Sequence, residues 1–365
     1  MNEQFWGQWI GEIKGTNDGL VQLNIDSDRL DRGFLTVYEY GSDRASFSCD
    51  LLLTKTENTL SGKAFNVIPN LLPGDTLSAE QAQSLMPTEI NVSAEIDEAG
   101  NLTARWDTDV ETIGSGTLYN AEQCEASDAH ATITWNQFKE IALQSKHAND
   151  EMIFRGQHDS SFALKTYFHR QGRRNLQRYA KEDLPVLHRH IAATINRKFD
   201  FASSEEHTEL IFLAQHHGYP TPLLDWSNSP FVAAYFAFQS VPKGDASGAS
   251  RIFMFDSREW ELSGPERAIA LEDPRPSFCL FNLVTRGNPR VLPQQSLVTF
   301  SNVYSIERFI RFYENRNNKR YLTVFDIPHS ERATVMKDLE IMGITASTLF
   351  PGVDGVCKSL TEMYF

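Results

Sequence analysis

Residues 215–238 read QHHGYPTPLLDWSNSPFVAAYFAF, and the interpretation of the whole chain starts from them. Polar groups that can carry chemistry come first, at Gln215 and the two histidines that follow it. After a turn through Gly218 and two prolines, an acid and a hydroxyl flank an indole in Asp225-Trp226-Ser227. Pro230 then opens an apolar, alanine-rich helix. Such a helix start suits the floor of a pocket for a polar ligand, because its first amides are unpaired and its dipole is positive there.

Helix capping is the alternative interpretation of the polar residues 225–229, since Asp, Ser and Asn are common N-cap residues. Capping does not account for the adjacent histidines His216 and His217 before a Gly-Pro-Pro turn, so we predict a site. Histidine titrates near neutral pH and serves as a general acid or base. Adjacent residues at a helix end point in different directions, so at most one histidine faces the site. The competing interpretation is a buried histidine that is satisfied by hydrogen bonds.

A second block lies upstream, where the apolar residues 152–154 predict a buried strand that ends at Arg155-Gly156. A guanidinium at a buried strand end needs an anion, because burying it unpaired is costly. One interpretation is an ion pair with Asp225 or Asp354 that holds the core together. The other is recognition of phosphate or ribose by Arg155, with Gly156 letting the ligand approach the backbone.

These blocks together resemble the FRG domain, which is named for its Phe-Arg-Gly tripeptide. The family pattern continues through Gln-His-x-Gly-x-x-Thr-x-Leu-Leu-Asp-Trp-[Ser/Thr]-x-Ser-Pro, an Ala-rich helix, Arg-x-x-x-Gln near a strand, and Leu-Phe-Pro-x-x-Asp-Gly. Here the pieces are residues 154–156, 215–238, 290–295 and 349–355, and the resemblance covers about residues 130–365. The pattern has a single histidine, at the place of His216. One departure is the glycine expected after the glutamine, which is replaced in residues 295–297.

The blocks around Arg155 and Ser227 also resemble, in order and spacing, the first two elements of the split fold of ADP-ribosyltransferases. In that family an aromatic-Arg-Gly strand holds the phosphate-ribose part of NAD, a Ser-containing strand precedes a helix, and a later strand supplies a glutamate. Residues 290–295, which we predict as a strand, carry amides where that carboxylate is expected. Farther along the chain, Glu340 and Asp354 are the acids that we consider for this role.

The resemblance implies one polar cleft that takes NAD or another nucleotide. Arg155 is expected to hold the phosphate, while His216 and Ser227 position the ribose. A carboxylate, which we take to be Asp354, is expected to stabilise the oxocarbenium charge and activate the acceptor. The predicted catalytic residues are Arg155, His216, Asp225, Ser227 and Asp354. The predicted ligand-binding residues are Phe154, Gly156, Gln215, Trp226, Gln294 and Gln295.

Metal-site and nucleotide-loop patterns are absent from the sequence. There is no His-x-x-x-His, Cys-x-x-Cys or His-Glu-x-x-His pattern, so we predict no metal site. The P-loop and dinucleotide glycine patterns and the Gly-x-Ser-x-Gly elbow are missing too. A bound nucleotide is therefore expected to be held by another route.

The charge distribution divides the chain in two. The net charge is -14, and residues 1–125 hold 7 Lys and Arg against 21 Asp and Glu, whereas the remaining residues balance 27 against 27. Residues 1–125 also alternate apolar and polar side chains between turn signals, which predicts an antiparallel β-barrel or sandwich. We predict an α+β protein, with an acidic β-rich domain at 1–125 and an FRG domain with a central cleft at 130–365.

Partners are predicted from the same distribution. The acidic domain either confers solubility or docks a basic protein or nucleic-acid partner. The basic stretch 165–198, expected to be largely helical, follows a phosphate backbone, presents a solvated face or docks the acidic domain. Four scattered cysteines, no signal peptide and no long apolar run predict a cytoplasmic protein without a membrane segment.

Three function classes remain open at this point. The first is an ADP-ribosyltransferase-like enzyme that uses NAD or a nucleotide, as a toxin or phage-defence effector, a role suggested by the company that FRG domains keep. The second is a nuclease with RNA or DNA along the basic stretch and a metal near Asp225. The third is a non-catalytic module that binds a ligand or partner.

Overall fold

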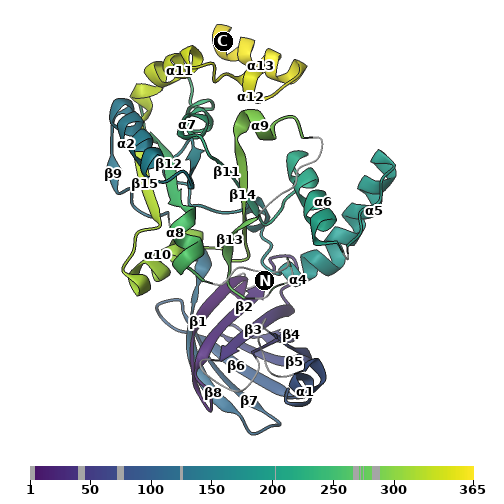
Figure 1. Ribbon diagram of the computed structural model, residues 1–365. Helices are drawn as coiled ribbons and strands as arrows, with labels where there is room; N and C mark the ends of the chain where they lie inside the picture. Colours follow the sequence, from purple (N-terminus) through teal and green to yellow (C-terminus); the bar gives the residue numbers. More distant parts are fainter. Residues whose placement is uncertain are drawn as a thin grey trace.

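The structure is a computed structural model of the chain, and it describes residues 5–39, 46–71, 78–123, 126–201, 203–265, 271, 273, 275–281 and 288–365. Figure 1 shows a barrel formed by the N-terminal third and, above it, a sheet flanked by helices. The C-terminal helices lie at the end of the molecule farthest from the barrel (Figure 1).

Within the described residues, the N-terminal third forms a closed antiparallel barrel in which each strand pairs with the next and the last pairs with the first. Its strands are β1 (Gly7–Gly15), β2 (Gly19–Ile25), β3 (Arg32–Glu39), β4 (Phe47–Lys55), β5 (Thr59–Pro69), β6 (Ile90–Ile96), β7 (Leu102–Thr108) and β8 (Ile113–Asn120). The short helix α1 (Ala79–Ser84) lies between β5 and β6, and the 3-10 turn η2 (Ala121–Gln123) follows β8.

Alternation of side chains explains the barrel. Residues such as Trp9, Leu23 and Leu35 point inward and build one apolar core, as a period of two requires. Their neighbours point outward, and several of these are polar yet buried, including Gln8 and Asn24. Buried outward residues mean that another part of the protein covers this wall of the barrel.

The rest of the chain forms a mixed sheet that has seven strands among the described residues, in the order β13-β14-β11-β10-β12-β15-β9. All of its pairings are antiparallel except that of β15 with β9. The strands are β9 (Ala131–Thr132), β10 (Met152–Gln157), β11 (Leu223–Ser227), β12 (Ala249–Asp256), β13 (Phe278–Phe281), β14 (Ser296–Ser301) and β15 (Leu322–Pro328).

Helices cover both faces of this sheet (Figure 1). One apolar core joins the sheet to α2 (Trp135–Ala148), α7 (Pro230–Phe238), α11 (Arg332–Ile341) and α12 (Ala346–Leu349), and another joins it to α8 (Ser257–Ser263) and α10 (Ile306–Asn317). A third core joins it to α3 (Tyr167–Arg170), α4 (Leu176–Arg178), the π-helical turn η3 (Tyr179–Asp183), α5 (Leu184–Ile195) and α6 (Ser204–His216). The remaining helices are α9 (Val291–Gln294), the 3-10 turn η4 (His329–Glu331) and α13 (Val353–Tyr364).

One of the secondary-structure predictions is refined and one is wrong. The basic stretch is largely helical, as expected, but the chain turns at Gly172, which has a φ of 74°, and only then enters α4, η3 and α5. Residues 291–294 form α9 instead of a strand, and the helix ends at Gln295 in the left-handed conformation. The strand that follows, β14, begins one residue later.

The outer wall of β1 and β2 docks on the sheet domain through polar side chains. The Gln8 amide donates a hydrogen bond to the Asn302 carbonyl at 2.8 Å, and the Gln8 side-chain oxygen accepts one from the Tyr304 amide at 2.9 Å. The expected boundary between residues 125 and 130 falls between β8 and β9, and residues 124 and 125 themselves lie outside the described residues. The domain limits 1–125 and 130–365 remain predictions.

Candidate functional site

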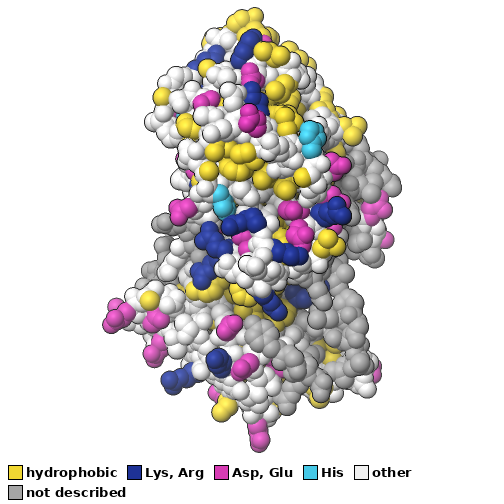
Figure 2. Space-filling view, turned by 60° about the vertical axis from the view of Figure 1, so that its left-hand side comes forward, with side chains coloured by type: hydrophobic (Ala, Val, Ile, Leu, Met, Phe, Trp, Pro, Cys, Tyr) yellow, Lys and Arg dark blue, Asp and Glu magenta, His cyan; other side chains and the backbone are white. Residues whose placement is uncertain are grey.

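A pocket of about 1100 Å³ opens in the sheet domain. Its walls come from elements far apart in sequence, and the polar and aromatic side chains among them include Arg155, Arg170, Gln215, His216, Asp225, Arg290 and Phe350. Figure 2 shows Lys and Arg side chains gathered at the level where the sheet domain meets the barrel, with hydrophobic side chains above them. The pocket volume is of the size that small-molecule sites reach.

Arg155 comes from β10 and lies half-buried in the pocket wall. Its Nη1 donates a hydrogen bond to the backbone carbonyl of Asp225, and its buried Nε has no hydrogen-bond partner. Arg155 forms no ion pair with any described residue, so the first of its two interpretations, an ion pair with Asp225 or Asp354, does not hold. The pKa of Arg155 is lowered to about 10, mainly by desolvation, with the charge of Asp225 opposing the shift and the guanidinium of Arg170 adding to it. This arrangement leaves a desolvated cation beside an open pocket, with the charge of Asp225 nearby but no ion-paired acid among the described residues.

Asp225 faces the pocket from β11, and a hydrogen-bond relay fixes its carboxylate. Gln215 Nε2 donates to Asp225 Oδ1 at 2.5 Å, and the buried hydroxyl of Thr221 donates to Gln215 Oε1. The side chain is open to the pocket, but the protein around its other sides desolvates it and raises its pKa, against the opposing effects of Arg155 and the Gln215 hydrogen bond. Raised pKa values of this kind are frequent at functional sites.

Residues 150–246 match the FRG domain family. The chain contains an FRG domain. The matched segment runs from the start of β10 to just before β12, so it includes Arg155, Gln215, His216 and Asp225. No curated protein matches the chain. A solved structure of a redesigned β-barrel, mFAP1, bound to DFHBI is 14% identical, with 32% of this chain and 96% of that chain covered and a TM-score of 0.24.

The two adjacent histidines of the FRG domain have different surroundings. His216 lines the pocket at the end of α6, and its Nδ1 lies 3.4 Å from the Asn288 amide nitrogen. Desolvation lowers its pKa, with the cation of Arg290 and the neighbouring His217 acting in the same direction. His217 caps the helix, is exposed and is not part of the pocket wall. A neutral imidazole at position 216 is able to accept a proton.

Ser227 and the glutamines connect the pocket to its frame. The Ser227 hydroxyl donates to the Gln294 carbonyl at 2.7 Å and accepts from the Ser229 amide at 3.0 Å, which leaves one lone pair for a ligand. Gln294 lines the pocket and donates to the Leu349 carbonyl at 2.9 Å. Gln295 lies outside the pocket wall, and its carbonyl accepts from the Asn228 amide.

Three of the predicted ligand-binding residues have packing roles. Phe154 is fully buried in the core under α7. The Trp226 indole is also buried, and its Nε1 donates to Thr299 at 2.9 Å. A Cβ on Gly156 would lie 2.0 Å from the Ala233 carbonyl oxygen, so the glycine lets α7 approach β10. Close helix packing thus accounts for the glycine at position 156, and its role in ligand approach stays a prediction. Phe154, Gly156 and Trp226 all contribute surface to the pocket.

Asp354 does not line the pocket. It lies exposed in the first turn of α13, which begins after Gly352 with a φ of 117°. The motif glycine nearby, Gly355, packs where a Cβ would lie 1.9 Å from the Phe350 carbonyl oxygen. The 349–355 block therefore packs α13 against α12 and supplies Phe350 to the pocket, while Asp354 stays outside.

Sequence reasoning missed three side chains of the pocket wall. Arg170 comes from α3, which the expectation of a largely helical stretch did not separate from the residues that follow. Arg290 was visible as the first residue of the Arg-x-x-x-Gln block, and its guanidinium carbon lies 5.2 Å from the centre of the Phe350 ring. Phe350 was likewise present in the Leu-Phe-Pro block. Motif membership was thus the available signal for two of the three.

Two negative findings apply to the described residues alone. No three His, Cys, Asp or Glu side chains in this part of the chain lie close enough to hold a metal ion. None of the helices found there has the length and apolar character that crossing a bilayer requires.

Proposed function

We propose that the FRG domain binds NAD or a closely related nucleotide in this pocket and transfers its ADP-ribosyl group to an acceptor. The observation that carries the proposal is a set of three guanidiniums, Arg155, Arg170 and Arg290, that line one pocket without an ion-paired acid among the described residues. Arginine is the residue that best matches phosphate oxygens, because its planar donors bind two of them at once. A pyrophosphate is the group that such a set would neutralise.

The order of the strands supports the transferase class over simple anion binding. β10 carries Arg155, β11 carries Ser227 and leads into α7, and these two strands and β14 are consecutive neighbours in the sheet. The three elements of the ADP-ribosyltransferase resemblance therefore meet around one pocket. Gln294 and Gln295, just before β14, replace the expected glutamate, so the acid must come from elsewhere.

Asp225 is the acid that we assign to this role. The proposed reaction breaks the bond between ribose C1′ and the nicotinamide nitrogen, and the electron pair leaves with nicotinamide. Anionic Asp225 stabilises the positive charge that develops on the ribose, since a carboxylate in a desolvated site acts strongly on nearby charge. An acceptor oxygen or nitrogen then bonds to C1′ and gives its proton to neutral His216.

The test is incubation of the full chain with NAD labelled in its adenylate phosphate, in parallel with labelled RNA. We expect nicotinamide release and transfer of the label to protein or to an added acceptor. Arg155→Lys should reduce the rate on the order of 100-fold, because the charge remains while the two-pronged phosphate contact is lost. His216→Gln should also reduce the rate, whereas the matched control His217→Gln should not.

Other outcomes identify the competing classes. Saturable NAD binding without turnover would assign the domain to non-catalytic ligand binding, and cleavage of RNA without NAD loss would assign it to nucleic-acid processing. Thermal unfolding of each variant separates a lost site from a lost fold, since about 1 kcal/mol shifts the midpoint measurably. Equal activity of Arg155→Lys and the unaltered chain would remove the proposal.

A further inference from the structure

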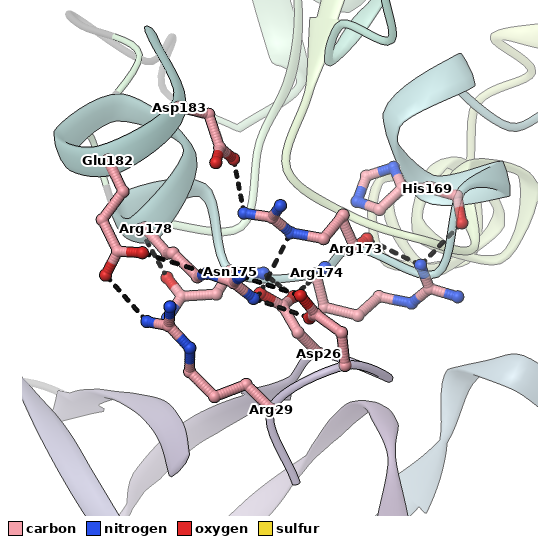
Figure 3. Close-up of polar contacts among 10 residues, drawn as sticks. Asp26, Arg29, His169, Arg173, Arg174, Asn175, Arg178, Glu182 and Asp183 are labelled. Carbon is pink, nitrogen blue, oxygen red and sulfur yellow. Dashed lines mark hydrogen bonds and ion pairs between the residues drawn. The ribbon is translucent and has the colours of Figure 1, made fainter. Parts of the chain in front are cut away.

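A carboxylate of the barrel lies buried where the barrel contacts the FRG domain. Asp26, one residue beyond β2, has a side chain that is 2% exposed. Its Oδ1 accepts hydrogen bonds from the backbone amides of Arg174 at 2.6 Å and Asn175 at 2.9 Å. Its Oδ2 accepts from Arg173 Nε at 3.1 Å and Arg178 Nη1 at 2.9 Å. Figure 3 shows these groups converging on Asp26 from the segment between α3 and η3.

Arg174 extends the contact toward the pocket. It is 2% exposed, and its Nε and Nη2 pair with both carboxylate oxygens of Glu122 at 2.5 and 2.7 Å. Its Nη1 donates to the backbone carbonyl of His169 at 2.6 Å, which lies in the last turn of α3. The guanidinium also lies over the Tyr304 ring, with 4.2 Å between the guanidinium carbon and the ring centre. The barrel thus fixes the backbone on both sides of the turn at Gly172.

The residue after His169 is Arg170, one of the three pocket guanidiniums. The positive charge of Arg170 lowers the pKa of Arg155 and opposes the rise in the pKa of Asp225. A second set of contacts links the barrel to the pocket. The side-chain oxygen of Gln8 accepts a hydrogen bond from the Tyr304 amide, and the Tyr304 hydroxyl accepts one from Lys165 at 2.7 Å. Lys165 also lines the pocket. Two pocket cations are therefore held in place by contacts that begin on the barrel.

We propose that Asp26 is a positioning residue for the pocket, which acts through Arg170, so that docking of the barrel completes the anion site of the FRG domain. A carboxylate satisfied by two main-chain amides and two guanidiniums is suited to fixing a turn that would otherwise have several conformations. The inference rests on the proposed function for the identity of the ligand. The positional part, from Asp26 to α3, stands on the contacts alone.

The test uses Asp26→Asn in the full chain, with Arg170→Ala and the double variant to complete a cycle. Asparagine keeps the shape but loses the charge that binds Arg173 and Arg178. We expect ADP to bind Asp26→Asn on the order of tenfold more weakly, which is about 1.4 kcal/mol. The same change should have no further effect once Arg170 is alanine, because coupled residues give non-additive results. Glu182→Gln, which loses ion pairs with Arg29 and Arg178 in the same cluster, should leave ADP affinity unchanged.

Hydrogen exchange supplies a readout that does not need the ligand. We expect faster exchange across α3 and the Gly172 turn in Asp26→Asn, and unchanged exchange in β11 and α7. Unchanged exchange in α3, or an equal loss of ADP affinity with and without Arg170, would overturn the inference. If the unaltered chain binds neither ADP nor NAD, the proposed function fails, and the exchange measurement still decides the role of Asp26.

Discussion

At the residue scale, Asp225 combines a functional position with a cost to the fold. Desolvation raises its pKa, so the folded state favours its protonated form. Protonated Asp225 stabilises the fold fully below the unfolded pKa, and this contribution is lost as the pH rises through the raised folded pKa. An ionised Asp225 therefore lowers the stability of the fold under working conditions.

Asp225→Asn should abolish activity without lowering stability. The neutral amide removes the desolvated charge, and its oxygen is able to keep the hydrogen bond from Gln215. We expect an activity loss on the order of 100-fold or more and a thermal midpoint that is equal to or above that of the unaltered chain. Calorimetry and the NAD assay on the same sample check both. A large drop in the midpoint would show that Asp225 is a structural ion.

The pocket residues also predict the pH profile. Activity needs an anionic Asp225 and a neutral His216, both deprotonated forms, so it should fall on the acid side. The pKa of His216 is lowered and that of Asp225 is raised, so the acid limb should follow whichever of the two pKa values is higher and should lie above the ordinary 3.8 of an aspartate. Nucleotide affinity should also weaken as the pH approaches 10, where Arg155 loses its proton. Rates and ADP affinities measured from pH 4 to 10.5 test this, and activity that does not fall toward acid pH would contradict it.

At the element scale, the contact between α7 and β10 depends on Gly156. A methyl group there would overlap the Ala233 carbonyl at 2.0 Å and approach the Ala237 Cβ at 2.9 Å. Gly156→Ala should therefore destabilise the fold by about 1–3 kcal/mol and weaken ADP binding, because Arg155 precedes it. Gly62→Ala in the barrel is the matched control, since its nearest neighbour is a Leu53 side-chain atom at 3.1 Å. Thermal unfolding measures both, and equal effects would mean that helix packing does not explain the glycine.

The elements differ in how far the sequence alone predicts them. Alternating side chains were enough to predict an antiparallel barrel or sandwich, because inward residues such as Trp9 and Leu23 follow a period of two, and the pairing of β1 with β8 makes it a barrel. The break at Gly172 was not predictable, since the carboxylate that fixes the turn is Asp26, which lies far away in sequence. Residues 290–295 read as a strand because their apolar run is short, and only the tertiary structure makes them α9. Arg155 and Asp225 were found by their motifs, whereas Arg170 has no motif and reaches the pocket through tertiary contacts.

At the scale of the whole molecule, the charge imbalance of the barrel has a partner within the chain. Glu122, Asp26 and Asp28 of the barrel pair with Arg173, Arg174 and Arg178 of the FRG domain. These arginines belong to the basic stretch 165–198, so part of that stretch docks the barrel. Nucleic-acid binding along the other cations of the stretch stays a prediction.

This docking predicts that the barrel and the FRG domain unfold together. Glu122→Gln would leave the buried guanidinium of Arg174 without its bidentate counter-ion, which costs about 3–5 kcal/mol for a buried pair. We expect calorimetry to show a lower midpoint and a separation of the single transition into two, because the interface no longer couples the domains. Glu182→Gln removes an exposed pair with Arg29, with side chains 49% and 37% exposed, and should change the stability by about 1 kcal/mol or less. A single transition at an unchanged midpoint in Glu122→Gln would mean that other contacts, such as those of Gln8, hold the two domains together.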